Sequence, residues 1–236
     1  MPKVDIVIPV YRNAATLPAL ASSLDRVCRG AGWDFTILFV IDACPQGSEK
    51  IAEALAAGHP EIAVYPLERN LGQHRAIWFG LRQAKGDFTF IMDADLQDPP
   101  EALPTLLPPL VEQGGVVFAG RRGHYESRSR LLSSKLFKTL LHWATGIPKD
   151  AGLFLVMDRA AREKMLQDPF PQPFLQAMIG CLKIPSRSIP VERNRRPEGT
   201  SSYRGLDRWK LGIGALLAVG RYRLRKRGTK AGGWKE

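Results

Sequence analysis

Cysteine, histidine and long apolar runs are all scarce in this chain of 236 residues. The three cysteines are odd in number and far apart, and the four histidines show no paired ligand spacing. The sequence therefore predicts neither a disulfide framework nor a zinc site, and a reducing, cytosolic environment is the simplest expectation. We interpret the histidines as surface or packing residues. The residues concerned are Cys28, Cys44, Cys181, His59, His74, His124 and His142.

No segment has the features of a membrane span or of an export signal. The longest uncharged apolar stretch, residues 211–220, is about half of the roughly 20 residues that a membrane-spanning helix needs. The sequence begins directly with the apolar residues 4–10, without a basic and apolar leader, so we expect no signal peptide. A hydrophobic content of 44% is still enough for a buried core, in one large domain or two small ones.

Positive charge is concentrated in the last fifth of the chain. Residues 187–236 contain 14 Lys and Arg against four acids, which accounts for +10 of the total net charge of +11. Such a segment is either solvated surface or a binding surface for anionic lipid headgroups or polyanionic substrates. Nucleic acid is not expected, because no aromatic-interleaved strand or DNA-binding motif accompanies the charge.

The first 120 residues alternate between apolar runs and amphipathic segments. This pattern predicts an α/β fold with a mostly parallel sheet that helices cover on both faces. Strands are expected at 4–10, 35–41, 61–65, 88–92 and 116–119, and helices at 16–29, 48–57 (with Ser48 as N-cap), 71–84 and 99–112. The second half is less regular, with a helix at 127–144, a strand at 153–157, a helix from Asp158, an extended basic loop at 191–203 and a last helix at 206–219.

The most informative segment is residues 86–101, where an apolar run stops at two aspartates. Asp93 and Asp95 are followed by Gln97 and by two prolines that suit the first turn of a helix. Alternation along an extended chain would point both carboxylates to the same side. Ligands of parallel sheets bind beyond the carboxyl ends of the strands, where Tyr11 and Asp42 also fall. This all-oxygen cluster therefore predicts a Mg²⁺ or Mn²⁺ site that holds a diphosphate.

The same two aspartates have two other interpretations. They could form only a turn and N-cap after a strand, or they could belong to a phosphohydrolase in which the first Asp is the nucleophile. Phosphohydrolases of that type generally carry the motif on the first strand of the fold, whereas here it follows about the fourth. The position of the motif argues against that class.

Three motifs carry the remaining information. They are Val4-Asp-Ile-Val-Ile-Pro-Val-Tyr11, Arg69-Asn-Leu-Gly72 with Ala76 and Gly80, and Asp93-Ala-Asp-Leu-Gln-Asp-Pro-Pro-Glu101. Together they resemble the family 2 glycosyltransferases of the GT-A fold, and most of all the dolichyl- or polyprenyl-phosphate sugar synthases, from Val4 to about Tyr203. The resemblance implies a metal-dependent, inverting transfer of a sugar from a UDP- or GDP-sugar to a polyprenyl-phosphate-like lipid. It also implies a cytosolic enzyme that is peripheral to the inner face of a membrane and contacts its anionic surface.

The resemblance further implies a role for each matching residue. Asp95 and Gln97 would ligate the metal, which neutralises the departing diphosphate. The acceptor phosphate is already an anionic nucleophile, so positioning matters more than a strong base. Arginines are suited to grip that phosphate bidentately, and the loop 193–203 would fold over the donor. The expected nucleotide-binding residues are Pro9, Tyr11, Asn13, Asp42, Asn70, Asp93, Ala94, Arg193, Arg196 and Ser201, and the expected catalytic residues are Asp93, Asp95, Arg121, Arg130, Ser134 and Asp150.

The chain departs from the family pattern at three places, which leaves the donor and acceptor open. Tyr11-Arg-Asn13-Ala14 stands where Tyr-Asn-Glu is common, Ile41-Asp42-Ala43-Cys44 where Asp-Asp-Gly-Ser is usual, and Asp150-Ala-Gly-Leu-Phe-Leu155 where Asp-x-Gly-Asp-Phe-Arg is frequent. Two alternatives stay open: transfer to a soluble or saccharide hydroxyl with Asp150 as general base, and a non-catalytic module that binds nucleotide or anionic membrane. We expect one domain at 1–220, with a nucleotide-sugar half at 1–120 and an acceptor half at 121–220, and a basic tail at 221–236.

Overall fold

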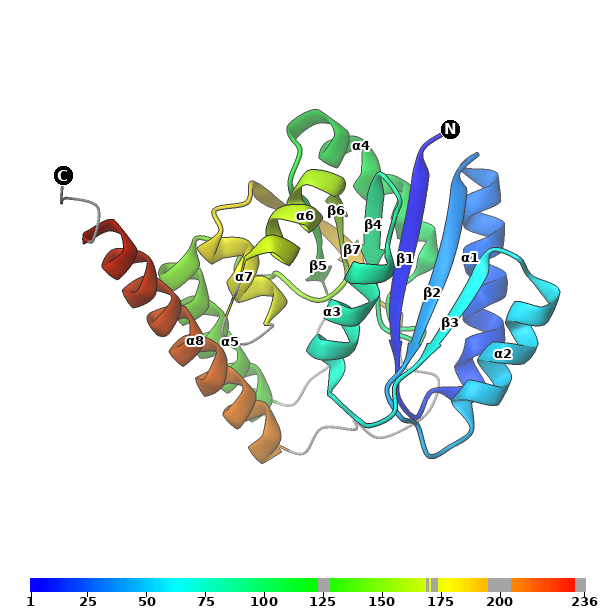
Figure 1. Ribbon diagram of the computed structural model, residues 1–236, viewed down its shortest axis with the longest axis horizontal. Coiled ribbons are helices and arrows are strands. Elements are labelled where there is room, and N and C mark those ends of the chain that lie inside the picture. The colour runs from blue at the N-terminus through cyan, green and yellow to red at the C-terminus, as the bar shows by residue number, and fades with distance from the viewer. Residues whose placement is uncertain (123–127, 169, 171–173, 195–204, 232–236) are drawn as a thin grey trace.

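The computed structural model describes residues 1–122, 128–168, 170, 174–194 and 205–231, and their side chains at 1–120, 137–168, 170, 174–194 and 212–225 (Figure 1). The described residues form a seven-stranded sheet in the order β3-β2-β1-β4-β6-β5-β7. The strands are β1 (Lys3–Val10), β2 (Asp34–Ile41), β3 (Ile62–Pro66), β4 (Phe88–Ile91), β5 (Val116–Arg122), β6 (Leu155–Asp158) and β7 (Ser186–Glu192). β6 runs antiparallel to its neighbours β4 and β5, and the other pairs are parallel. The expected mostly parallel sheet is confirmed.

Helices cover both faces of the sheet. One core layer lies beneath α1 (Leu17–Gly30), α2 (Ser48–Gly58) and α4 (Leu103–Gln113), and the other beneath α3 (Gln73–Gln83), α6 (Arg159–Gln167) and α7 (Leu175–Cys181). The helices α5 (Arg128–Thr145) and α8 (Gly205–Ala231) join the second layer, and two short 3₁₀ helices are η1 (Ala14–Thr16) and η2 (Pro100–Ala102). Ile6 and Ile8 of β1 face the first layer and Val7 the second, so the strand is apolar throughout.

Four local features differ from the sequence expectations. The α7 helix and the β7 strand were not expected, and α8 continues through Gly220, where a tail was expected to begin, as far as Ala231. The predicted N-cap of α2 was wrong by one residue. Gly47 occupies the cap with φ +71°, and the buried Ser48 starts the helix with its hydroxyl against Cys44. Among the described residues, no helix combines the length and hydrophobicity needed to cross a membrane.

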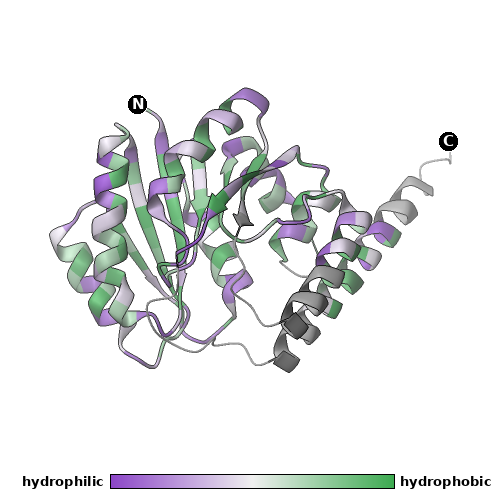
Figure 2. Cartoon of the chain, turned by 180° about the vertical axis from the view of Figure 1, so that it is seen from behind, coloured by the Kyte–Doolittle hydropathy of each residue, from purple (hydrophilic) through white to green (hydrophobic). Residues whose placement is uncertain are grey.

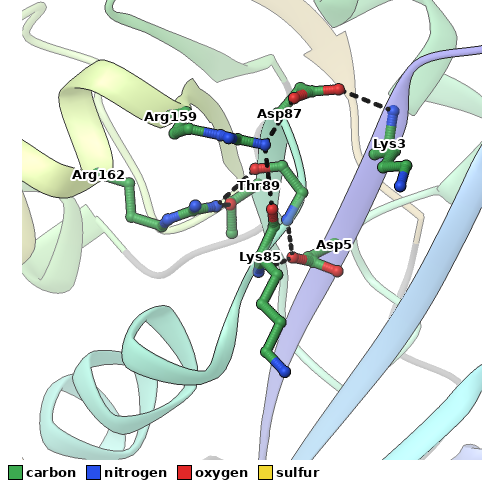
Figure 3. A network of polar contacts seen from close by, with 8 residues as sticks. Lys3, Asp5, Lys85, Asp87, Thr89, Arg159 and Arg162 are labelled. Atoms are coloured by element: carbon green, nitrogen blue, oxygen red, sulfur yellow. Dashed lines mark hydrogen bonds and ion pairs between the residues drawn. The ribbon is translucent and has the colours of Figure 1, made fainter.

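A polar network fastens the amino-terminal ends of β1 and β4 to α6 (Figure 3). The buried Asp5 carboxylate accepts the backbone N–H groups of Lys85 and Gly86 at 2.5 and 2.6 Å. Arg162, also buried, donates to the Gly86 carbonyl at 3.0 Å and to Thr89 Oγ1 at 2.7 Å. Burial lowers the pKa of Arg162, but the carboxylate of Asp5 opposes that shift. These contacts fix the strands at the end opposite to the predicted site.

Candidate active site

The carboxyl ends of three neighbouring parallel strands place the predicted site residues side by side. β1 lies between β2 and β4 in the sheet, and the register aligns Val10 with Ile41. Tyr11, Asp42 and Asp93 follow these strands, so they meet at one edge of the sheet as expected. Pro9 is buried within β1 itself.

The chain turns immediately after β4, and this turn corrects one sequence argument. The turn includes Ala94 and Asp95, and Leu96 adopts a positive φ of 60°. The alternation expected of an extended strand therefore does not apply to the two aspartates. The turn is held by Thr16 Oγ1, which donates to the Ala94 carbonyl at 2.6 Å, and by the Gln97 N–H, which donates to Asp95 Oδ1 at 3.2 Å.

Asp93 is oriented by a residue that the sequence analysis missed. Gln73, the first residue of α3, donates through Nε2 to Asp93 Oδ1 at 2.6 Å. The preceding Gly72 has φ +85°, a conformation that favours glycine. The only signal in the sequence was its position directly after the Arg69-Asn-Leu-Gly72 motif.

Asp42 holds the loop that leads into α3. The residue is 3% exposed, and its carboxylate accepts the backbone N–H groups of Leu71 at 2.6 Å and of Gly72 at 2.9 Å. Asn70 Nδ2 donates to the Asp42 carbonyl at 3.2 Å. Asp42 and Asn70 are thus brought together, and the carboxylate fixes the backbone from which Gln73 reaches Asp93.

A buried ion pair connects the start of the basic loop to the turn that contains Asp93, Asp95 and Gln97, which we call the aspartate turn. Arg193 Nε donates to Asp98 Oδ1 at 2.7 Å, and Arg193 Nη1 lies 3.5 Å from Gln97 Oε1. The Asn194 N–H donates to the Gln97 carbonyl at 2.9 Å. Burial acts to lower the pKa of Arg193, but the adjacent Asp98, with the charges of Asp93 and Asp95, holds that pKa above its ordinary value. Asp98 was not among the expected site residues.

Asp150 lies against the carboxyl-terminal part of β5. Ser188 Oγ of the neighbouring β7 donates to Asp150 Oδ2 at 2.8 Å. A Cβ at Gly120 would lie 2.2 Å from that oxygen and 2.3 Å from Ser188 Oγ, so only glycine fits here without displacement. The next residue along β5 is Arg121. Arg121, Arg130 and Ser134 are located by their backbone alone, in β5 and α5, and Arg196 and Ser201 lie outside the described residues.

Residues 5–166 match the family described as Glycosyl transferase family 2. The chain belongs to this family. It is similar to two undecaprenyl-phosphate 4-deoxy-4-formamido-L-arabinose transferases, from Aeromonas hydrophila subsp. hydrophila (38% identity over 193 residues) and Pseudomonas fluorescens (33% over 204 residues). These alignments cover 81% and 85% of the chain but only 55% and 60% of the two relatives.

The fold of this family 2 chain is also seen in solved structures. One is glucosyl-3-phosphoglycerate synthase from Mycobacterium tuberculosis, in complex with Mn²⁺, UDP and glucosyl-3-phosphoglycerate. It superposes with a TM-score of 0.67 at 19% identity, over 92% of this chain and 80% of the other. The predicted family and GT-A fold are confirmed.

Two of the departures from the pattern of family 2 meet in space. Arg12, with a positive φ of 61°, donates its backbone N–H to Cys44 Sγ at 3.1 Å, and Cys44 Sγ lies 3.0 Å from Ser48 Oγ. Partial burial acts to raise the pKa of Cys44, but the hydrogen bond with Ser48 and three backbone hydrogen bonds lower it. Asn13 lies beside them, and its carbonyl accepts from Thr16 Oγ1 at 2.9 Å. The departures that follow β1 and β2 therefore form one local arrangement next to the aspartate turn.

A second group of possible metal ligands lies elsewhere on the family 2 fold. Asp25, His59 and Glu61 have ligand atoms within 4.8 Å of one another, which sequence spacing did not reveal. Arg29 already lies between the two carboxylates, at 2.7 Å from Asp25 and 2.5 Å from Glu61. The arginine therefore supplies the positive charge at this position, near the start of β3 and away from the aspartate turn.

Proposed function

We propose that this chain transfers a sugar from a UDP- or GDP-sugar to a polyprenyl-phosphate-like lipid, at the inner face of a membrane. The observation that carries the proposal is the convergence of Asp93, Asp95, Gln97 and Arg193 beyond the end of β4. The names of the two relatives, which specify undecaprenyl phosphate, support the acceptor class. The UDP and Mn²⁺ bound to the mycobacterial structure support a nucleotide donor and a divalent metal.

The donor atoms of the aspartate turn fit Mg²⁺ or Mn²⁺. Asp95 and Gln97 offer a carboxylate and an amide oxygen, the hard ligands that these ions prefer. Asp93 and Asp95 also contribute to the raised pKa of Arg193, which indicates a negative potential at this place. A cation bound there would supply neutralisation of the charge that develops on the leaving diphosphate.

The other residues of the site would bind and orient the substrates. Pro9, Tyr11, Asn13 and the loop with Asn70 that Asp42 supports would bind the base and ribose. Gln73 would fix the rotamer of Asp93, and Asp98 would hold Arg193 towards the diphosphate. Arg196 and Ser201 would extend that loop, and Arg121, Arg130 and Ser134 would bind the lipid phosphate. Such an acceptor reacts as an anion, so alignment with the donor supplies most of the rate.

The mechanism is tested by Asp95→Ala. The matched control is Asp34→Ala, which removes an exposed carboxylate at the start of β2, the end of that strand opposite to the site. We expect Asp95→Ala to abolish sugar transfer to undecaprenyl phosphate, and Asp34→Ala to keep it, while circular dichroism spectra stay unchanged. Transfer should require Mn²⁺ or Mg²⁺. Full activity of Asp95→Ala in the presence of EDTA would contradict the proposal.

One observation favours a second acceptor class. The Asp150 carboxylate lies beside β5, hydrogen-bonded to Ser188, where a general base for a hydroxyl acceptor could stand. Assays of lipid phosphate against free sugars and glycosides separate the two acceptor classes. Under the hydroxyl alternative, Asp150→Asn would abolish transfer to the sugar. Nucleotide binding by calorimetry without transfer or donor hydrolysis would instead indicate a non-catalytic module.

A further inference from the structure

The α8 helix carries apolar side chains on two opposite faces. Its buried face packs against the domain through Ala215, Ala218, Val219 and Tyr222. Ile213, Leu217 and Leu224 are 53%, 55% and 69% exposed. Successive helical residues are rotated by about 100°, so these three residues lie on one line opposite to the buried face. The outer line has no partner among the described residues.

Arginines lie on both sides of this outer line. Arg221 and Arg225 are exposed on one side, and Arg223 is exposed on the other, where it also donates to the Ala144 carbonyl at the end of α5. The segment 221–230 contains six Lys and Arg and no acidic residue. The exposed apolar line is therefore bordered by positive charge.

The neighbouring α5 helix extends the same type of surface. Its Phe137 lies at Gly212, where an added Cβ would be 3.3 Å from the ring, and its last turn meets Arg223, so α5 and α8 run side by side in the same direction (Figure 1). Leu140 and Trp143 of α5 are 39% and 76% exposed. Figure 2 shows hydrophobic and hydrophilic positions side by side along these helices.

Exposed apolar side chains are more frequent on α5 and α8 than elsewhere among the described residues. Among the described residues, seven large hydrophobic side chains are exposed, and five of them lie on α5 and α8: Leu140, Trp143, Ile213, Leu217 and Leu224. Scattered exposed apolar residues are ordinary, but a contiguous group bordered by polar residues marks an interaction surface.

We propose that these five residues, with Arg221, Arg223 and Arg225, form an outer helical face that lies in the headgroup region of an anionic membrane. Leucine and isoleucine side chains enter the acyl boundary, tryptophan is favoured at this depth, and arginines contact anionic headgroups. Such a membrane contact rests on the proposed function for its role, which is access to a lipid acceptor. The observations that support it are the exposure and charge of the two helices.

An anionic bilayer fits this face better than a second copy of the chain does. In a symmetric dimer the same patch of each subunit meets its twin. The arginines that border the outer line would then approach the arginines of the other copy, and like charges in contact oppose association. Lipid headgroups of opposite charge remove that conflict.

Both helices of this face begin on the same side of the molecule as the site. Both helices begin at the edge of the molecule where the carboxyl ends of β1, β2 and β5 lie, as Figure 1 shows. The strand β5 ends at Arg122, only six positions before α5 begins at Arg128. A membrane against α5 and α8 would therefore bring the phosphate of an embedded lipid towards the aspartate turn.

Vesicle flotation tests this inference without donor or acceptor. We expect the protein to float with vesicles of phosphatidylglycerol and phosphatidylcholine, and far less with phosphatidylcholine alone. Leu217→Gln/Leu224→Gln should lower the partition coefficient about tenfold or more. Arg221→Gln should lower it about fivefold, and high salt should act in the same direction. Val111→Gln, at a 64% exposed site on α4, is the matched control and should bind as the parent does.

Trp143 provides an independent readout. Its fluorescence should shift to the blue on binding to the mixed vesicles, and Trp143→Phe should remove that shift. Equal partitioning of Leu217→Gln/Leu224→Gln and Val111→Gln would overturn the proposal. So would self-association without vesicles that the double variant abolishes, because a second copy would then be the occupant. Intact vesicle binding by a chain that neither hydrolyses nor transfers donor sugar would instead refute the proposed function and leave this face standing.

Discussion

Replacing Arg193 by methionine tests the ion pair that attaches the chain at 193–194 to the aspartate turn. The side chains of Asp98 and Arg193 are 1% and 14% exposed, so the variant leaves a buried carboxylate without its cation. Removing one partner of a buried pair costs about 3–5 kcal/mol. Asp98 Oδ2 and Arg193 Nη2 have no hydrogen-bond partner among the described residues, so the pair is incompletely satisfied. We therefore expect a loss of about 3 kcal/mol in the free energy of unfolding, at the lower limit of that range.

The assay is urea unfolding followed by circular dichroism, with the midpoint compared at an unchanged denaturant slope. Arg193→Met/Asp98→Leu removes both charges and should recover most of the stability, because a buried pair is often replaced by apolar residues at little cost. A loss below about 1 kcal/mol in Arg193→Met would refute the reasoning, since Asp98 would then not carry a costly buried charge. A double variant as unstable as the single one would assign the loss to packing.

Three further changes have defined outcomes. Gly120→Ala places a Cβ 2.2 Å from Asp150 Oδ2 and 2.3 Å from Ser188 Oγ, so we expect the free energy of unfolding to fall by about 1–3 kcal/mol in thermal unfolding. Asp150→Ala in the same chain should restore part of this loss, because the contact with Ser188 Oγ remains. Asp42→Asn removes the charge that accepts two backbone N–H groups and should cost about 1.5–3 kcal/mol, with faster hydrogen exchange at Leu71 and Gly72. Burial lowers the pKa of His74, which packs against Phe174, to about 4. Between about pH 6.5 and 4 the unfolded chain then binds the proton more readily than the native one. The free energy of unfolding should therefore decrease as the pH is lowered through that window, by at most about 3 kcal/mol. His74→Gln should flatten this part of the curve of stability against pH. An unchanged pH profile in His74→Gln would contradict the assignment.

The sequence was most informative where one physical pattern dominates. Strands β1, β2 and β4 are buried on both faces, so their continuous apolar runs were recognisable. The α7 helix was missed because six of its seven residues are buried, which leaves no amphipathic period to detect. The β7 strand lies at the edge of the sheet, is largely half-exposed and contains Pro190, which is tolerated there but weakens a strand prediction.

The site shows the same division. Asp93, Asp95 and Gln97 occupy alternate positions of one short motif, which indicated them directly. Gln73 and Asp98 act through partners 20 and 95 positions away, and only the packing of the sheet brings those partners together. The turn at Ala94–Asp95 depends on Thr16, which lies 78 positions earlier in the chain, so its geometry could not be derived from the local sequence.

Because α8 continues to Ala231, the number of residues in it determines the direction in which its later side chains point. Residues between Val219 and Leu224 connect an inward position to an outward one, and each residue adds about 100° of rotation. An insertion of one residue there would turn Leu224 and Arg225 away from their present side, whereas seven residues, close to two full turns, would nearly restore the alignment. Related sequences should therefore tolerate changes of length in this helix chiefly in steps of about seven residues, which a flexible tail would not require.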